Sequence, residues 1–136
     1  MSDLTGSNTE TVRRFMAALN VCDIAAINEL LHPDANWWVL GIGSMDRETL
    51  IRQLQAMLGS ATIAETKIIG TTAEGKRVAV ESEGHFEFTD GRVYRNSYHH
   101  LFILDDGMVT GVREYLDTAL VSRVFGETSV ARSTMS

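Results

Sequence analysis

The stretch VAVESEGHFEFTDGRVYRNSYHHLFIL, residues 78–104, decides the fold because it predicts two long strands joined by a tight turn. Apolar and polar residues alternate on both sides of Asp90–Gly91, and alternation with period two is typical of a β-strand. An Asp-Gly pair between two such runs is a hairpin signal. The sequence therefore predicts antiparallel strands over 76–89 and 92–104.

The segments around this hairpin predict an α+β fold. Downstream, Asp105–Asp106–Gly107 marks a second turn, which is followed by a strand over 108–117 and a short helix over 118–125. Upstream, helical spacing and capping residues predict helices over 8–20, 24–32 and 47–58, capped by Ser7, Asp23 and Asp46, with strands over 35–40 and 62–70. This order indicates three N-terminal helices packed on one face of a strongly curved, mostly antiparallel sheet, which forms a cone-shaped barrel with an internal cavity.

The composition is that of a soluble globular protein. The 136 residues are 44% hydrophobic and 22% charged, and no apolar run approaches the ~20 residues that a membrane helix needs. We expect a single domain over residues 1–136, with an ordered core over 8–125 and a flexible tail over 126–136. Cys22 is the sole cysteine and no secretory signal is visible, which favours the cytoplasm.

The charge pattern argues against several classes of partner. A net charge of −6 without a run of Lys or Arg disfavours nucleic acid and anionic membranes. Gly41-x-Gly43 has neither a third glycine nor a following basic residue, so it does not predict a nucleotide site. The strands carry residue types that can bind metals, but in no familiar motif. We therefore expect neither a metal nor another cofactor.

Three stretches carry a resemblance to a known superfamily. They are FMAALNVCDIAAINELLHPDANWWV (residues 15–39), GRVYRNSYHHLFILDDGMV (91–109) and VREYLDTALVSRVF (112–125). With the predicted order of elements, they resemble the SnoaL-like and ketosteroid-isomerase-related branch of the nuclear-transport-factor-2-like superfamily. The resemblance implies a cone with a small-molecule pocket, and often a dimer. It leaves the activity open, because isomerases, dehydratases, cyclases, epoxide hydrolases and non-enzymes share this architecture.

The limonene epoxide hydrolase family within this superfamily implies a register for the site. Counting back from Gly91 without a gap places Glu83 at the family's acid Asp and Glu81 at its Arg. Counting forward from Gly107 places Glu114 at its base Asp. The first strand has Trp37 and Val39 where the family has a water-holding tyrosine and asparagine.

This register implies which side chains face the cavity. They are Trp37 and Val39 on the first strand, then Ala79, Glu81, Glu83 and His85, then Asn96, Tyr98, His100 and Phe102, then Val112, Glu114 and Leu116. Val78, Val80, Phe86 and Phe88 would then form an apolar convex face, which a homodimer would bury. The alternation alone favours the opposite arrangement, with these apolar residues inside and the charges in water.

Two functions follow as hypotheses. The first is a cofactor-free acid–base enzyme (isomerase, dehydratase, cyclase or hydrolase) acting on a small apolar or polyketide- or steroid-like molecule. Glu114 would be the base, Glu83 or Glu81 an acid kept protonated by crowding, and His100 and Tyr98 polarising donors. Ligand contacts would come from Trp37, Val39, His85, Asn96, Val112 and Leu116.

The second hypothesis is a ligand-binding or protein-interaction module without catalysis. It is motivated by the absence of the family's Arg and of its water-holding tyrosine and asparagine.

Overall fold

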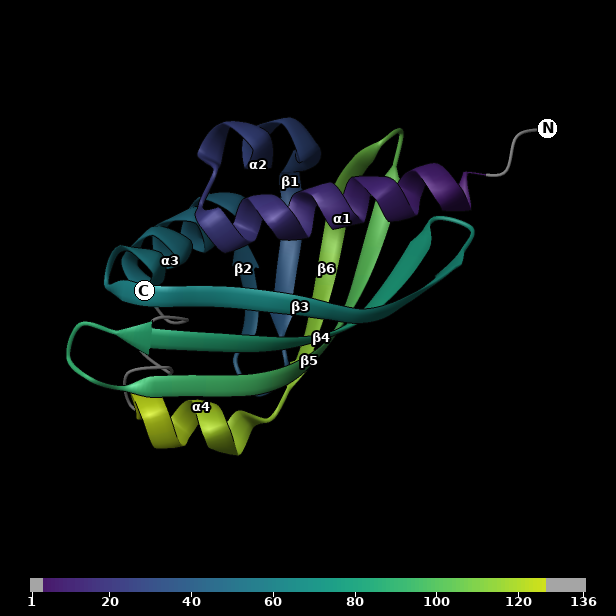
Figure 1. Cartoon of the computed structure of the whole chain (residues 1–136). Coiled ribbons are helices and arrows are strands. Elements are labelled where there is room, and N and C mark those ends of the chain that lie inside the picture. Colours follow the sequence, from purple (N-terminus) through teal and green to yellow (C-terminus); the bar gives the residue numbers. More distant parts are fainter. Residues whose placement is uncertain (1–3, 127–136) are drawn as a thin grey trace.

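A computed structural model describes residues 4–126, in which helices pack against a strongly curved sheet (Figure 1). The elements are α1 (Thr5–Val21), α2 (Ile24–Leu30), β1 (Leu31–Val39), β2 (Gly43–Asp46), α3 (Arg47–Gly59), β3 (Ala61–Glu74), β4 (Arg77–Phe88), β5 (Val93–Asp105), β6 (Met108–Leu116) and α4 (Thr118–Phe125). The six strands lie in the order β2-β1-β6-β5-β4-β3. β1 and β6 run parallel, and the other neighbours run antiparallel. The predicted fold class is confirmed, although the sheet does not close. Most of the predicted tail lies outside the described residues.

Aspartate side chains explain where three of the helices begin. Asp23, Asp46 and Asp117 precede α2, α3 and α4, and each carboxylate accepts a hydrogen bond from a backbone N–H two or three residues further on. These bonds satisfy N–H groups that have no partner within the helix. The predicted starts of these helices are therefore confirmed.

Three boundaries near the N-terminus differ from the prediction. α1 already begins at Thr5, so Ser7 lies inside the helix, and its hydroxyl donates to the Leu4 carbonyl instead of capping. α2 ends at Leu30, and Pro33 lies inside β1, because proline restricts the residue before it to extended conformations. The strand β2 was not predicted; it follows a turn in which Gly41 and Gly43 have positive φ angles.

The main core lies between the helices and the inner face of the sheet. Phe15 and Ile27 from the helices meet Val78, Val80 and Phe102 from the strands, and all five are fully buried. A second apolar cluster joins Phe86, Phe88 and Tyr94 to α3 and α4. These packed side chains fix the inner face of β4 and β5, where the cavity described below is found.

The structure corrects the predicted facing of β4. Val78, Val80, Phe86 and Phe88 point inward and are buried, whereas Glu81 and Glu83 are exposed on the outer face, which His85 and Ala79 share. Counting back from Gly91 transfers a relative's facing only if both turns have the same length, and a shift of one residue turns every side chain to the other face.

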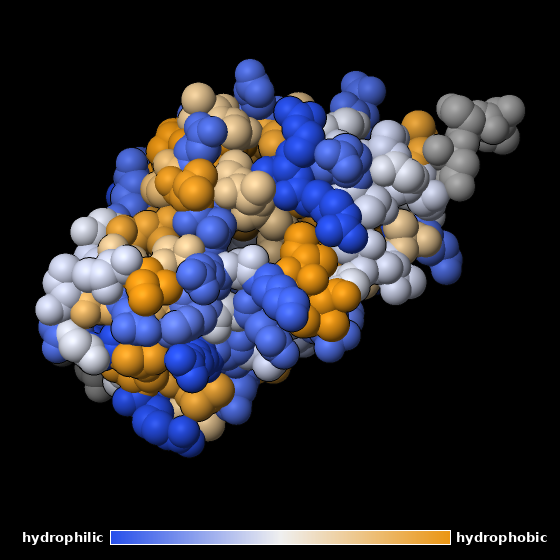
Figure 2. All heavy atoms as spheres, in the orientation of Figure 1, coloured by the Kyte–Doolittle hydropathy of each residue, from blue (hydrophilic) through white to orange (hydrophobic). Residues whose placement is uncertain are grey.

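The outer face of the sheet is therefore more polar than predicted. The reason given for a homodimer, an apolar convex face on β4, no longer applies. In Figure 2 hydrophilic and hydrophobic residues are interspersed over the visible part of the strands β3 to β5. Within residues 4–126, no helix is long and apolar enough to cross a membrane.

Candidate active site

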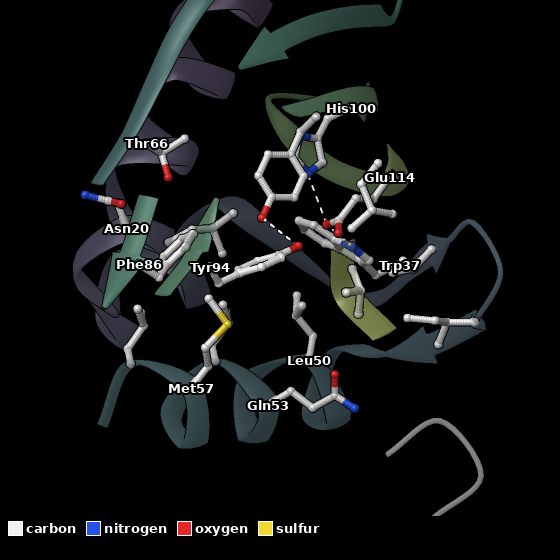
Figure 3. Close-up of a pocket in the computed structure, with 18 of the residues that line it drawn as sticks. Asn20, Trp37, Leu50, Gln53, Met57, Thr66, Phe86, Tyr94, His100 and Glu114 are labelled. Atoms are coloured by element: carbon white, nitrogen blue, oxygen red, sulfur yellow. Dashed lines mark hydrogen bonds and ion pairs between the residues drawn. The ribbon is translucent and has the colours of Figure 1, made fainter. Parts of the chain in front are cut away.

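The inner face of the sheet, α1, α3 and α4 line a partly open cavity of about 250 Å³ (Figure 3). Apolar side chains supply most of its wall, including Met16, Leu50, Leu54, Met57, Phe86, Val121 and Phe125. Its polar groups are few: Trp37, Tyr94, Tyr98, His100, Glu114, Asn20, Gln53 and Thr66. An apolar cavity with a few convergent polar groups is the usual form of a small-molecule site.

Glu114 is the centre of one polar cluster. The Trp37 indole N–H donates to Glu114 Oε1 at 3.2 Å, and His100 Nε2 lies 3.0 Å from the same oxygen. His100 and Glu114 are direct cross-strand neighbours on β5 and β6, which explains why their side chains meet. Both contacts end on Oε1, and among residues 4–126 no side chain is found hydrogen-bonded to Oε2. One carboxylate oxygen, Oε1, is therefore held in place by two side chains.

The ring of His100 is buried and held on several sides. It stacks on Tyr98 with ring centroids 5.5 Å apart, and it meets Trp37 edge-on at 5.9 Å. Because Nε2 faces a carboxylate, it is the nitrogen that carries the proton. His100 Nδ1 is buried without a hydrogen-bond partner in the described part of the chain. The imidazole therefore holds Glu114 through Nε2, and its other nitrogen is buried.

A second polar cluster joins two tyrosines. The Tyr98 hydroxyl donates to the Tyr94 hydroxyl at 3.2 Å, and the Asn96 amide donates to the same oxygen at 2.9 Å. Two hydroxyls carry two protons, and their mutual bond uses one of them. The other proton is not used in this bond. Burial raises the pKa of both Tyr94 and Tyr98, so both keep their protons at neutral pH.

Asn96 holds this tyrosine cluster in place. Its amide nitrogen also donates to the Asp117 carbonyl, and its amide oxygen accepts from the backbone N–H groups of Ser97 and Asp117. All of its contacts are thus made within the protein. Asn96 was predicted to contact a ligand, but in the structure it connects Tyr94 to the start of α4.

The other predicted site residues lie in three places. Trp37, Val39, Tyr98, His100, Glu114 and Leu116 line the cavity, whereas Val112 is buried in the main core. Glu81 and Glu83 lie on the outer face with His85, whose Nε2 is 2.8 Å from Glu87. The expected crowding of three carboxylates around one cavity is therefore wrong, and Glu114 is alone there among the described Asp and Glu residues.

The sequence reasoning missed four polar groups of the cavity, which are Tyr94, Asn20, Gln53 and Thr66. Tyr94 shares the facing of Tyr98 and His100, so the alternation along β5 could have identified it. Asn20 and Thr66 come from the end of α1 and from β3, and no sequence pattern distinguishes them from surface residues. No cluster of three or more His, Cys, Asp or Glu side chains within residues 4–126 is arranged to hold a metal ion.

Comparison with known proteins gives the class of protein that this fold and cavity define. The chain belongs to the SnoaL-like domain family, whose sequence profile matches residues 12–112. A search of curated proteins finds no match.

Solved structures share the fold over nearly the whole chain. A candidate SnoaL-like polyketide cyclase from Jannaschia sp. CCS1 is 19% identical with a TM-score of 0.79, over 93% of this chain and 96% of that one. An LEH-like epoxide hydrolase from M. tuberculosis is 20% identical with a TM-score of 0.75, over 98% and 92%. Bal32a, from a soil-derived mobile gene cassette, is 23% identical with a TM-score of 0.80, over 90% and 98%. At these identities the likeness shows the fold.

Proposed function

We propose that this protein is an enzyme that moves a proton on a small, mostly apolar organic molecule by using its own side chains. The observation that carries the proposal is the Glu114 carboxylate, held through Oε1 by Trp37 and His100 at the wall of an apolar cavity. Solved relatives described as an epoxide hydrolase and as candidate polyketide cyclases support small-molecule chemistry in this fold.

The two polar clusters have complementary roles in such a reaction. Glu114 Oε2 takes a proton from a carbon next to a carbonyl. The C–H electron pair forms a C=C bond, and the π pair of the carbonyl moves onto its oxygen. The free proton of the Tyr94–Tyr98 pair donates to that oxygen as its negative charge develops. Return of the proton to another carbon gives isomerisation, loss of a β-hydroxyl gives dehydration, and attack on a second carbonyl gives cyclisation.

This assignment changes the proposed acid. Glu81 and Glu83 lie on the other side of the sheet from the cavity, so the tyrosine hydroxyls take over the donor role. Glu114 remains the proposed base. His100 acts by positioning Glu114, and Trp37 both forms part of the wall and donates to the carboxylate.

The ring opening of 5-nitrobenzisoxazole tests the base directly. A base removes its ring C–H proton, the N–O bond breaks, and a coloured phenolate forms. We expect wild-type protein to exceed acetate as a base, and Glu114→Gln to lower kcat/KM by about 100-fold or more. Glu83→Gln is the matched control and should stay within about twofold. A Glu114→Gln variant with full activity would overturn the role of Glu114.

A non-catalytic ligand-binding module is the alternative function. The observation in its favour is that two hydrogen bonds already hold the Glu114 carboxylate, as in a structural cluster. Recovery of unchanged 5-nitrobenzisoxazole after long incubation with stoichiometric protein, despite measurable binding, would support this alternative.

We also propose a location in the cytoplasm, since a sole cysteine, Cys22, fits a reducing compartment. We further propose a homodimer that forms through the outer face of the sheet. The support comes from Ile103 and Tyr115, which are partly exposed on that face. Sedimentation equilibrium measures the assembly, and a monomer at micromolar concentration would contradict the proposal.

A further inference from the structure

The helix α4 is the least buried helix of the described chain. Each of its residues, Thr118–Phe125, is at least partly exposed, whereas α1, α2 and α3 each bury one residue or more. It packs against β5 (Figure 1) and supplies Val121 and Phe125 to the wall of the cavity. A short helix with few buried contacts has little stability of its own, and such elements open locally more often than a protein core does.

Arg92 fastens the last turn of α4 to the hairpin between β4 and β5. Its guanidinium lies 5.4 Å from the centre of the Phe125 ring and 5.6 Å from that of Phe88. Its Nη1 donates to the Val124 carbonyl at 3.4 Å, and its Nε donates to Asp90 at 2.7 Å. A cation near the last carbonyl groups of a helix stabilises that end. Because water reaches these contacts, they hold the helix only weakly.

The first turn of α4 is connected to the tyrosine pair through Asn96. Asp117 caps α4 with its carboxylate, and its backbone carbonyl and N–H bond with the Asn96 amide at 3.0 and 3.1 Å. The same amide donates to the Tyr94 hydroxyl at 2.9 Å. At the other end of the helix, the Phe125 ring meets the Tyr94 ring edge-on, with centroids 5.0 Å apart. Contacts from both ends of α4 therefore hold Tyr94.

We propose that α4 is a lid over the cavity and that its closure fixes Tyr94. Opening moves Val121 and Phe125 out of the cavity wall and separates Asp117 from Asn96, so a ligand enters while Tyr94 is loosened. Closure over the ligand restores the contacts at the hydroxyl and the ring of Tyr94. This motion goes beyond the function proposed above, because it requires a cavity that admits a ligand and no particular role for Glu114.

Hydrogen exchange followed by NMR tests the lid on the full chain without a ligand. We expect the backbone amides of Val121–Gly126 to have protection factors at least about tenfold lower than those of β4 and β5. Arg92→Ala should accelerate exchange in α4 about fivefold and leave β4 and β5 within about twofold, since it frees one end of the helix. Arg95→Ala removes an arginine from the outer face of β5 and is the matched control, which should change neither.

A second variant loosens the other end of α4. Asp117→Ala removes the cap and should accelerate exchange in α4 about fivefold, whereas Asp117→Ser can still cap and should restore slow exchange. The side-chain amide protons of Asn96 report the connection to Tyr94, because they bond to the Tyr94 hydroxyl and the Asp117 carbonyl. They should exchange faster by the same factor as α4 in both Arg92→Ala and Asp117→Ala.

The compact apolar probe 1-tetralone tests closure over a ligand. At millimolar concentration it should slow exchange in α4 about tenfold, because it binds only when the lid is closed. Glu114→Gln should show the same slowing, whatever happens to turnover of 5-nitrobenzisoxazole. Exchange in α4 that is as slow as in β4 and β5, or that is unchanged by the probe, would overturn the lid. Acceleration of α4 without acceleration of the Asn96 side-chain protons would overturn its connection to Tyr94.

Discussion

The inner and outer faces of the sheet each carry a histidine beside a glutamate, and the two pairs differ in what surrounds them. On the inner face, His100 lies 3.0 Å from Glu114, and their side chains are 8% and 18% exposed. On the outer face, His85 lies 2.8 Å from Glu87, and their side chains are 27% and 37% exposed. The shorter contact is thus the one with more water around it.

The neighbours of each pair decide what it can do. Arg95 approaches His85 on the outer face and water reaches the glutamate, so the pair resembles an ordinary surface ion pair. Trp37 donates to Glu114 on the inner face, and Tyr98 stacks on His100 beside an apolar cavity. Low solvent content strengthens hydrogen bonds and raises the cost of leaving a group unpaired. The difference teaches that burial beside the cavity, and not the His–Glu distance, distinguishes the pair that we propose as functional from the surface pair.

Removing the glutamate from each pair should give the largest difference between the two faces. Glu114→Ala leaves the Trp37 N–H and His100 Nε2 without their acceptor, at a cost of about 1–3 kcal/mol for each donor. Glu87→Ala should change stability by less than about 1 kcal/mol. Chemical denaturation measures both values.

Glu114→Gln is the control for that comparison. It keeps an Oε1 acceptor for both donors, so it should be more stable than Glu114→Ala while still losing the base. Equal losses of stability for Glu114→Ala and Glu87→Ala would show that the two pairs are energetically alike.

The two faces also show how far the sequence determines the site. Alternation along β4 and β5 correctly separated each strand into two sets, because a strand turns every second side chain to the same face. The resemblance assigned the wrong set of β4 residues to the cavity. The alternating pattern alone had favoured the right set, with Val78 and Val80 inside, and both are buried in the structure. A register counted through a turn is therefore weaker evidence than the burial of apolar side chains on the same strand.

The remaining parts of the site depend on contacts that no single segment encodes. His100 and Glu114 could be predicted, since both lie on strands whose facing was correctly inferred. The Tyr94–Asn96–Tyr98 network also depends on the start of α4, because the Asn96 amide hydrogen-bonds with the backbone N–H and carbonyl of Asp117. Asn20 and Thr66 line the same cavity because α1 docks on β3. Such pairings follow from packing between distant segments.

Adding one methyl group to glycines on the two faces should give the next largest difference. Gly84 faces inward, and a Cβ atom there would lie 2.9 Å from ring carbons of both Phe86 and Tyr98. Gly84→Ala should therefore displace Tyr98 and cost about 1–3 kcal/mol. On the outer face, a Cβ at Gly111 meets Ile103 at an ordinary 3.6 Å, so Gly111→Ala should gain up to about 1 kcal/mol.

Thermal or chemical unfolding of the two alanine variants tests this difference. Weaker binding of 1-tetralone by Gly84→Ala would accompany the displacement of Tyr98 from its bond with Tyr94. If Gly84→Ala proved as stable as Gly111→Ala, the close fit of Tyr98 against β4 would be refuted.

The smallest difference concerns the two buried tyrosines and becomes visible only in alkali. Burial raises the pKa of Tyr94 and Tyr98 in the folded state, while the unfolded chain titrates near the ordinary tyrosine value of about 10. Below that pH both states keep these protons, so stability does not depend on them. As the pH rises further, the unfolded state binds fewer protons than the folded state, and the free energy of unfolding falls. Each tyrosine contributes at most about 1.4 kcal/mol per pH unit to this decrease.

Urea denaturation between about pH 9 and 11 should therefore show a shallower decrease in the free energy of unfolding for Tyr98→Phe than for wild-type protein. Parallel curves would mean that the inner face, like the outer one, lets water reach its ionisable groups, and the enclosure that distinguishes Glu114 from Glu87 would lose its support.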